Sequence, residues 1–110
     1  MSNSQAVWLT LAEHARFQAE KLAKVPLFES PRALLDVYCL EPGQEQRVHN
    51  HDRIDKVYLA LSGTPSVTLG DETRVLQPLQ AAVAPAGVPH GVRNSGSERA
   101  TLLVFQARQP

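Results

Sequence analysis

The sequence predicts an all-β protein, a sandwich or barrel of short antiparallel strands preceded by one short α-helix. From Pro26 onward, short β-favouring runs are separated by Pro, Gly, Asn and Asp. The segment VTLGDETRVL places Gly70-Asp71 between two alternating runs, which is typical of a hairpin. No helical pattern separates the strand runs, and closely spaced strands without helices between them favour an antiparallel barrel or sandwich.

The helix is predicted just ahead of the strands. Thr10 to Glu13 read TLAE, a capping-box sequence in which the Thr10 hydroxyl and the Glu13 side chain cap each other's backbone amides. The run LAEHARFQAEKLAK that follows is rich in good helix formers. Pro26 disfavours helical geometry at the residue before it. We therefore expect a helix over about residues 11–24.

The strand runs follow in order along the remaining chain: LFES, ALLDVYCLEP, QRVHNH, KVYLALSG, PSVTL, TRVLQP, AAVAPA, GVRN and ATLLVFQA. No repeat, linker or low-complexity tract interrupts them. A length of 110 residues is the size of one domain. We expect residues 26–110 to form a single β-barrel domain and residues 1–25 to be an N-terminal segment and helix packed on it.

Composition excludes several classes of protein. Eleven basic and eleven acidic residues cancel, which argues against binding to nucleic acid or to an anionic membrane surface. No apolar run reaches the roughly 20 residues that span a bilayer, and the first residues lack the pattern of a signal peptide. Cys39 is the only cysteine, which fits a reducing compartment. We expect a cytoplasmic protein that binds neither nucleic acid nor membrane.

Two histidines one residue apart are the first sign of a functional site. In a strand, alternate side chains share a face, so His49 and His51 point the same way, together with Arg47. Two imidazoles aimed into one space suit a metal ion. The spacing by itself also fits two polar residues on a solvated strand face.

A second stretch, PAGVPHGVRN, adds a histidine after a turn rich in proline and glycine. Together the two stretches resemble the cupin superfamily, whose motifs are G-x5-H-x-H-x3/4-E-x6-G and G-x5-P-x-G-x2-H-x3-N. The first motif is matched by Gly43, His49, His51 and Gly63. The second is matched by Pro85, Gly87, His90 and Asn94, with Leu79 where its leading glycine would stand.

The resemblance implies a double-stranded β-helix, or jelly-roll barrel. In such a barrel His49, His51 and His90 would converge on one divalent metal ion, and Asn94 would be a structural hydrogen-bonding residue. Imidazole ligands do not select among zinc, iron, nickel and manganese. Proteins of this kind are often homodimers, so we expect a homodimer here.

The sequence departs from the first motif at its glutamate. Counting back from Gly63 places Lys56 at that position, whereas counting forward from His51 reaches Asp55. In one interpretation Lys56 replaces the acid and three histidines hold the metal; in the other, Asp55 is a fourth ligand and a bulge absorbs the extra residue. We prefer the three-histidine interpretation. Lys56 could then be partly neutral, hold a carboxylate of the substrate, or extend into solvent.

The remaining candidates carry less weight. Tyr58 shares the inward parity of Lys56 and could donate to a ligand or fill the barrel, and Arg47 could bind an anion at the barrel mouth or lie on the surface. Cys39 fits a buried apolar position. His14 is assigned to solvent. Trp8 is expected to anchor the N-terminal segment on the barrel or on a partner subunit.

These features favour a metal-dependent enzyme of the oxygenase, isomerase or decarboxylase type. Three imidazoles leave coordination positions open for water or substrate, and a small barrel with Lys56 and Arg47 suits a small anionic molecule. Lys56, Tyr58 and Arg47 are the candidate catalytic residues. The alternatives are a non-catalytic metal- or ligand-binding module, such as a sensor or carrier, and a metal-free barrel whose histidines contact an organic ligand.

Overall fold

The computed structural model describes residues 5–109. A single-turn 3-10 helix, η1 (Leu11–His14), precedes nine strands in this part of the chain. The strands are β1 (Ala23–Glu29), β2 (Ala33–Leu40), β3 (Glu45–His49), β4 (Ile54–Ser62), β5 (Ser66–Leu69), β6 (Glu72–Val75), β7 (Ala81–Ala84), β8 (His90–Arg93) and β9 (Ala100–Arg108). No helix among the described residues is long and apolar enough to cross a bilayer.

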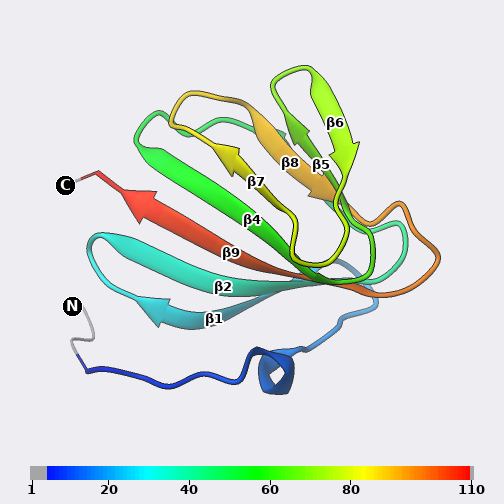
Figure 1. The fold of residues 1–110 in the computed structure, drawn as a ribbon, viewed down its shortest axis with the longest axis horizontal. Coiled ribbons are helices and arrows are strands. Elements are labelled where there is room, and N and C mark those ends of the chain that lie inside the picture. Colours follow the sequence, from blue (N-terminus) through cyan, green and yellow to red (C-terminus); the bar gives the residue numbers. More distant parts are fainter. Residues whose placement is uncertain (1–4, 110) are drawn as a thin grey trace.

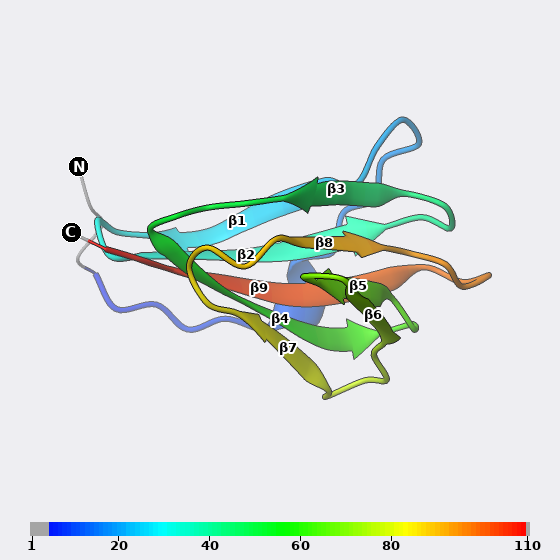
Figure 2. The same cartoon turned by 90° about the horizontal axis from the view of Figure 1, so that it is seen from above.

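The strands form two antiparallel sheets that face each other. One sheet has the order β1-β2-β9-β4-β7 (Figure 1). The other has the order β3-β8-β5-β6. Seen from above, the layer of β3, β8, β5 and β6 lies in front of the layer that contains β2, β9 and β4 (Figure 2). Apart from the consecutive pairs β1-β2 and β5-β6, neighbours in each sheet come from distant parts of the sequence, as in a jelly roll. The all-β barrel prediction is confirmed, and β5 and β6 form the hairpin expected around Gly70-Asp71.

The predicted helix over residues 11–24 is wrong. Only one 3-10 turn forms, and Thr10 makes no side-chain capping bond; instead the Glu13 amide donates to the Thr10 carbonyl at 3.1 Å. Residues from Ala23 onward pair with β2, so tertiary pairing overrides a weak helical propensity. Pro26 lies inside β1, an edge strand where a missing amide is tolerated. The expected boundary between residues 25 and 26 therefore falls within a strand.

The N-terminal segment packs on the outer face of the five-stranded sheet. Leu11, Ala15 and Phe17 contact a small cluster formed by Ala23, Val37 and Cys39. The Arg16 amide donates to the Cys39 sulfur at 3.3 Å. These contacts cover the outward side chains of β1 and β2, whose inward neighbours face the second sheet.

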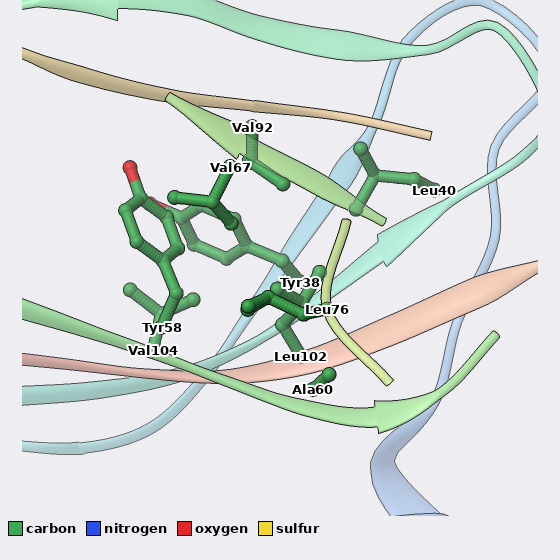
Figure 3. Packing of buried hydrophobic residues seen from close by; sticks show 9 residues of the cluster. All are labelled: Tyr38, Leu40, Tyr58, Ala60, Val67, Leu76, Val92, Leu102 and Val104. Atoms are coloured by element: carbon green, nitrogen blue, oxygen red, sulfur yellow. The ribbon is translucent and has the colours of Figure 1, made fainter. Parts of the chain in front are cut away.

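The main core fills the space between the two sheets. Its buried members are Tyr38, Leu40, Tyr58, Ala60, Val67, Leu76, Val92, Leu102 and Val104 (Figure 3). Asn94 closes one end of this core: its Nδ2 donates to the carbonyls of Leu40 and Glu98 at 3.0 and 2.8 Å, and its Oδ1 accepts from Gly96 at 3.1 Å. The structural role expected of Asn94 is confirmed. The other end of the interior is polar and holds the histidines.

Candidate metal centre

Three histidines from two neighbouring strands and a loop meet at one point. His49 ends β3, His51 follows in the loop, and His90 begins β8 directly opposite His49 in the register. The ring centroids of His49 lie 4.8 Å from His51 and 4.4 Å from His90. The nitrogen atoms that could bind a metal all lie within 4.8 Å of one another. The convergence expected of these imidazoles is therefore present.

Backbone carbonyls orient two of the rings. Nδ1 of His49 lies 2.8 Å from the Arg47 carbonyl, and Nδ1 of His90 lies 2.9 Å from the Val88 carbonyl. A carbonyl only accepts, so each Nδ1 carries the proton and each Nε2 presents a lone pair. The Nε2 of His90 is buried and has no hydrogen-bond partner within the described residues. A buried, unpartnered nitrogen lone pair beside two other imidazoles fits a metal ligand.

Burial also favours the neutral form of His51 and His90. The pKa of His90 is lowered, first by burial and then by the charge of Lys56 and by the other histidines, against the opposing bond to Val88. The pKa of His51 is lowered, again first by burial and then by His49 and Lys56. Neutral imidazole is the form that binds a metal ion. The surroundings of His51 and His90 therefore favour the protonation state that binds a cation.

A bulge in β3 changes which residues face the interior. The register of β3 against β8 shifts between Gln46 and His49, so strict alternation does not hold between them. Arg47, expected on the inward face with His49, is exposed. Gln46 takes the inward position instead, and sequence reasoning missed it. Only the pairing of two distant strands reveals the bulge, so no local signal marks Gln46.

Lys56 does not extend into solvent. It is 1% exposed, and its Nζ donates to Oε1 of Gln46 at 3.2 Å. The Lys56 Nζ also lies 5.1 Å from the ring centre of Tyr58 and 5.4 Å from that of Tyr38. Burial, reinforced by repulsion from Lys24 and opposed by Asp36, lowers the pKa of Lys56 to about 8.

Gln46 is the centre of a buried hydrogen-bond network. Its Oε1 accepts from Lys56 and also from the Tyr58 hydroxyl at 3.1 Å, while its Nε2 donates to the Tyr38 oxygen at 3.3 Å. Burial raises the pKa of both tyrosines, that of Tyr38 to about 12. The Tyr58 ring lies 6.2 Å from the His90 ring, so it connects the network to the histidine cluster.

Two acidic residues near Lys56 differ in their surroundings. Asp55 is exposed on the opposite face of β4, and its Oδ1 accepts from the Ala86 amide at 2.8 Å. Among the described residues, the group of side chains close enough to share a metal ion consists of the three histidines and does not include Asp55. Asp36 is buried on β2, and burial raises its pKa against the opposing charges of Lys24 and Lys56. A single acid inside the apolar run ALLDVYCL was the available signal for Asp36.

The remaining candidates lie away from the cluster. Cys39 is buried, and burial raises the pKa of its thiol, which fits the apolar position expected of it. His14 lies in η1 on the outer segment and is half-buried. Trp8 is 99% exposed, so it does not anchor the N-terminal segment on its own barrel.

Comparison with known proteins agrees with this architecture. The solved structure of TT1209 from Thermus thermophilus is 50% identical, with a TM-score of 0.90 over 94% of this chain and 98% of that one. An uncharacterised conserved protein with a double-stranded β-helix domain from Klebsiella pneumoniae has a TM-score of 0.86 over 94% of this chain and 91% of that one. Its identity is 23%, so that likeness shows the fold alone.

Among curated proteins, an H2HPP isomerase of Bacillus subtilis is 45% identical over 56 residues, half of this chain. The match spans only 23% of that isomerase. A family model described as a cupin domain matches residues 36–106, which include all three histidines and the whole Gln46–Lys56–Tyr58 network. A match over more than half of the chain, on a two-sheet barrel with a histidine cluster at one end, identifies this protein as a member of the cupin family.

Proposed function

We propose that this cupin holds one divalent metal ion through His49, His51 and His90 and binds a small anionic molecule beside it. The observation that carries the proposal is the buried Nε2 of His90, which has no partner among the described residues and lies in a cluster of nitrogens within 4.8 Å. A polar atom buried without a partner is costly, and a metal ion would remove that cost. Zinc, iron, nickel and manganese all accept imidazole.

The proposed activity is that of a metal-dependent enzyme. A metal held by three neutral imidazoles keeps open positions and supplies Lewis-acid chemistry to a bound substrate. Of the oxygenase, isomerase and decarboxylase types, the name of the Bacillus relative supports an isomerase. Lys56 and Tyr58 are the proposed substrate-contacting residues, because Gln46 fixes both polar heads beside the cluster. Arg47 is exposed and is proposed to attract anions to the mouth.

A binding module without turnover is the second candidate. Its support is Lys56, which stands where an acidic ligand is usual and would repel a bound cation. A weaker metal site suits reversible sensing or transport. Product formation with the native metal separates the two candidates, because a sensor binds the small molecule and releases it unchanged.

Metal analysis tests the metal centre directly. We expect untagged protein, purified without added metal, to contain about one divalent ion per chain, and His90→Ala to lose most of it. His14→Ala is the matched control, because His14 lies in η1, outside the cluster; it should keep the wild-type amount. If His90→Ala keeps its metal while circular dichroism shows an intact fold, the ligand set proposed here is wrong.

A further inference from the structure

The amines of Lys56 and Lys24 near the histidine cluster outnumber the acidic groups that act on them. Within residues 5–109, no carboxylate oxygen lies within 4.0 Å of the Lys56 amine. Lys24 adds a second amine, 5.4 Å from the centre of the Tyr38 ring. Asp36 is the acid whose charge acts on Lys56, and it acts on Lys24 as well. One carboxylate is thus shared by two amines.

A metal ion would make this imbalance larger. Three neutral imidazoles contribute no charge, so the ion keeps both of its positive charges. If Asp36 offsets Lys24, the charge of Lys56 adds to that of the ion. Like charges repel strongly where water is largely excluded. The site therefore lacks the negative charge that would let a metal ion and a protonated Lys56 occupy it together.

We propose that a carboxylate of the small-molecule ligand supplies this charge, so that metal and carboxylate bind cooperatively through Lys56. This inference rests on the proposed metal centre and adds the chemical class of its ligand. Gln46 accepts one of the three donors of the Lys56 ammonium, which leaves two for a carboxylate. The Lys56 amine lies 5.1 Å from the centre of the Tyr58 ring, and the centre of that ring lies 6.2 Å from the centre of the His90 ring, so the amine and the histidine cluster adjoin the same aromatic ring.

Coupling of this kind is reciprocal. If a carboxylate raises the affinity for the metal by some factor, the metal raises the affinity for the carboxylate by the same factor. The effect requires the negative charge and not merely the shape of the ligand. Acetate and acetamide have nearly the same shape and differ in charge, so they form a matched pair of probes.

The experiment is calorimetric titration of Zn²⁺ into metal-free protein in buffer alone, with acetate, and with acetamide. We expect acetate to tighten zinc binding by about tenfold, within the usual range of coupling between sites, and acetamide to leave it unchanged. Lys56→Gln should bind zinc more tightly than wild type without acetate and lose the acetate effect. Lys21→Gln, which removes an exposed lysine, should behave as wild type. Any binding of zinc by free acetate affects all variants equally.

The outcomes separate the two proposals. Zinc binding that acetate does not tighten overturns the inference and leaves the metal centre standing. Acetate enhancement that persists in Lys56→Gln, or that acetamide reproduces, also overturns the inference. Failure of the wild-type protein to bind zinc or any of the other three metals overturns the proposed metal centre itself. If Lys56→Gln does not fold, the comparison of acetate with acetamide on the wild-type protein still decides.

Discussion

Replacing Lys56 by methionine should stabilise the metal-free protein near neutral pH. Lys56 is 1% exposed in the wild-type protein, and the pKa of its amine falls from an ordinary 10.5 to about 8. The difference corresponds to about 3 kcal/mol of preference for the neutral amine over the ammonium. Methionine has a similar length without the charge. Loss of the bond to Gln46 costs about 1 kcal/mol, so we expect a net gain of about 2 kcal/mol at pH 7.

The pH dependence gives the sharper test. Between pH 8 and 10.5 the unfolded chain holds a proton on Lys56 that the folded chain has released. Stability of the wild-type protein therefore rises with pH in this window. From pH 7 to 9.5 the rise attributable to Lys56 is about 2 kcal/mol. Tyr38 and Tyr58 act in the opposite sense and only above about pH 10. Burial raises the pKa of each, so the unfolded chain releases these protons first and stability falls with pH there.

Urea unfolding in the presence of a chelator, followed by far-ultraviolet circular dichroism, measures both effects. Tryptophan fluorescence is unsuitable because Trp8 is 99% exposed in the folded protein. Subtracting the Lys56→Met profile from the wild-type profile cancels the titrating groups on which the charge of Lys56 does not act; it acts on Asp36, His51 and His90. Lys21→Met, at an exposed position, should match wild type within about 0.5 kcal/mol. A difference profile that stays flat between pH 7 and 9.5 would refute the electrostatic account of Lys56.

Three further predictions concern the network, a tight turn and assembly. Gln46→Leu leaves Lys56 and both tyrosine hydroxyls without their shared partner and should cost about 1–3 kcal/mol in urea unfolding; a loss below about 0.5 kcal/mol would contradict the network. Gly63→Ala should lower the thermal unfolding temperature more than Gly43→Ala. Both glycines have positive φ, but a Cβ at Gly63 would lie 2.5 Å from the Arg99 carbonyl oxygen, whereas a Cβ at Gly43 would meet nothing within 4 Å. Equal decreases in the two variants would show that the close approach to Arg99 is unimportant. Light scattering should give twice the mass of one chain, since a 99% exposed Trp8 suits a contact with a second copy; a monomer mass would count against the homodimer.

The sequence by itself determined the features that depend on local pattern. Alternating apolar residues and the Gly70-Asp71 turn placed the strands and the hairpin, because side-chain alternation and turn geometry are properties of a few consecutive residues. The two histidine motifs indicated the barrel and named the residues that converge. Each motif contains its own turn residues, such as Gly87 with a φ of 90°. Each motif can therefore be recognised without knowledge of the rest of the chain.

Only the tertiary structure decided the features that depend on distant partners. Residues 11–24 have helix-forming composition, yet pairing of β1 with β2 and packing of the preceding segment on the sheet are preferred because burial outweighs propensity. The bulge that turns Gln46 inward arises where β3 meets β8, and the burial of Lys56 arises where β4 lies between β9 and β7. A side chain's charge and partners depend on what the other sheet places opposite it, and no local window of sequence contains that information.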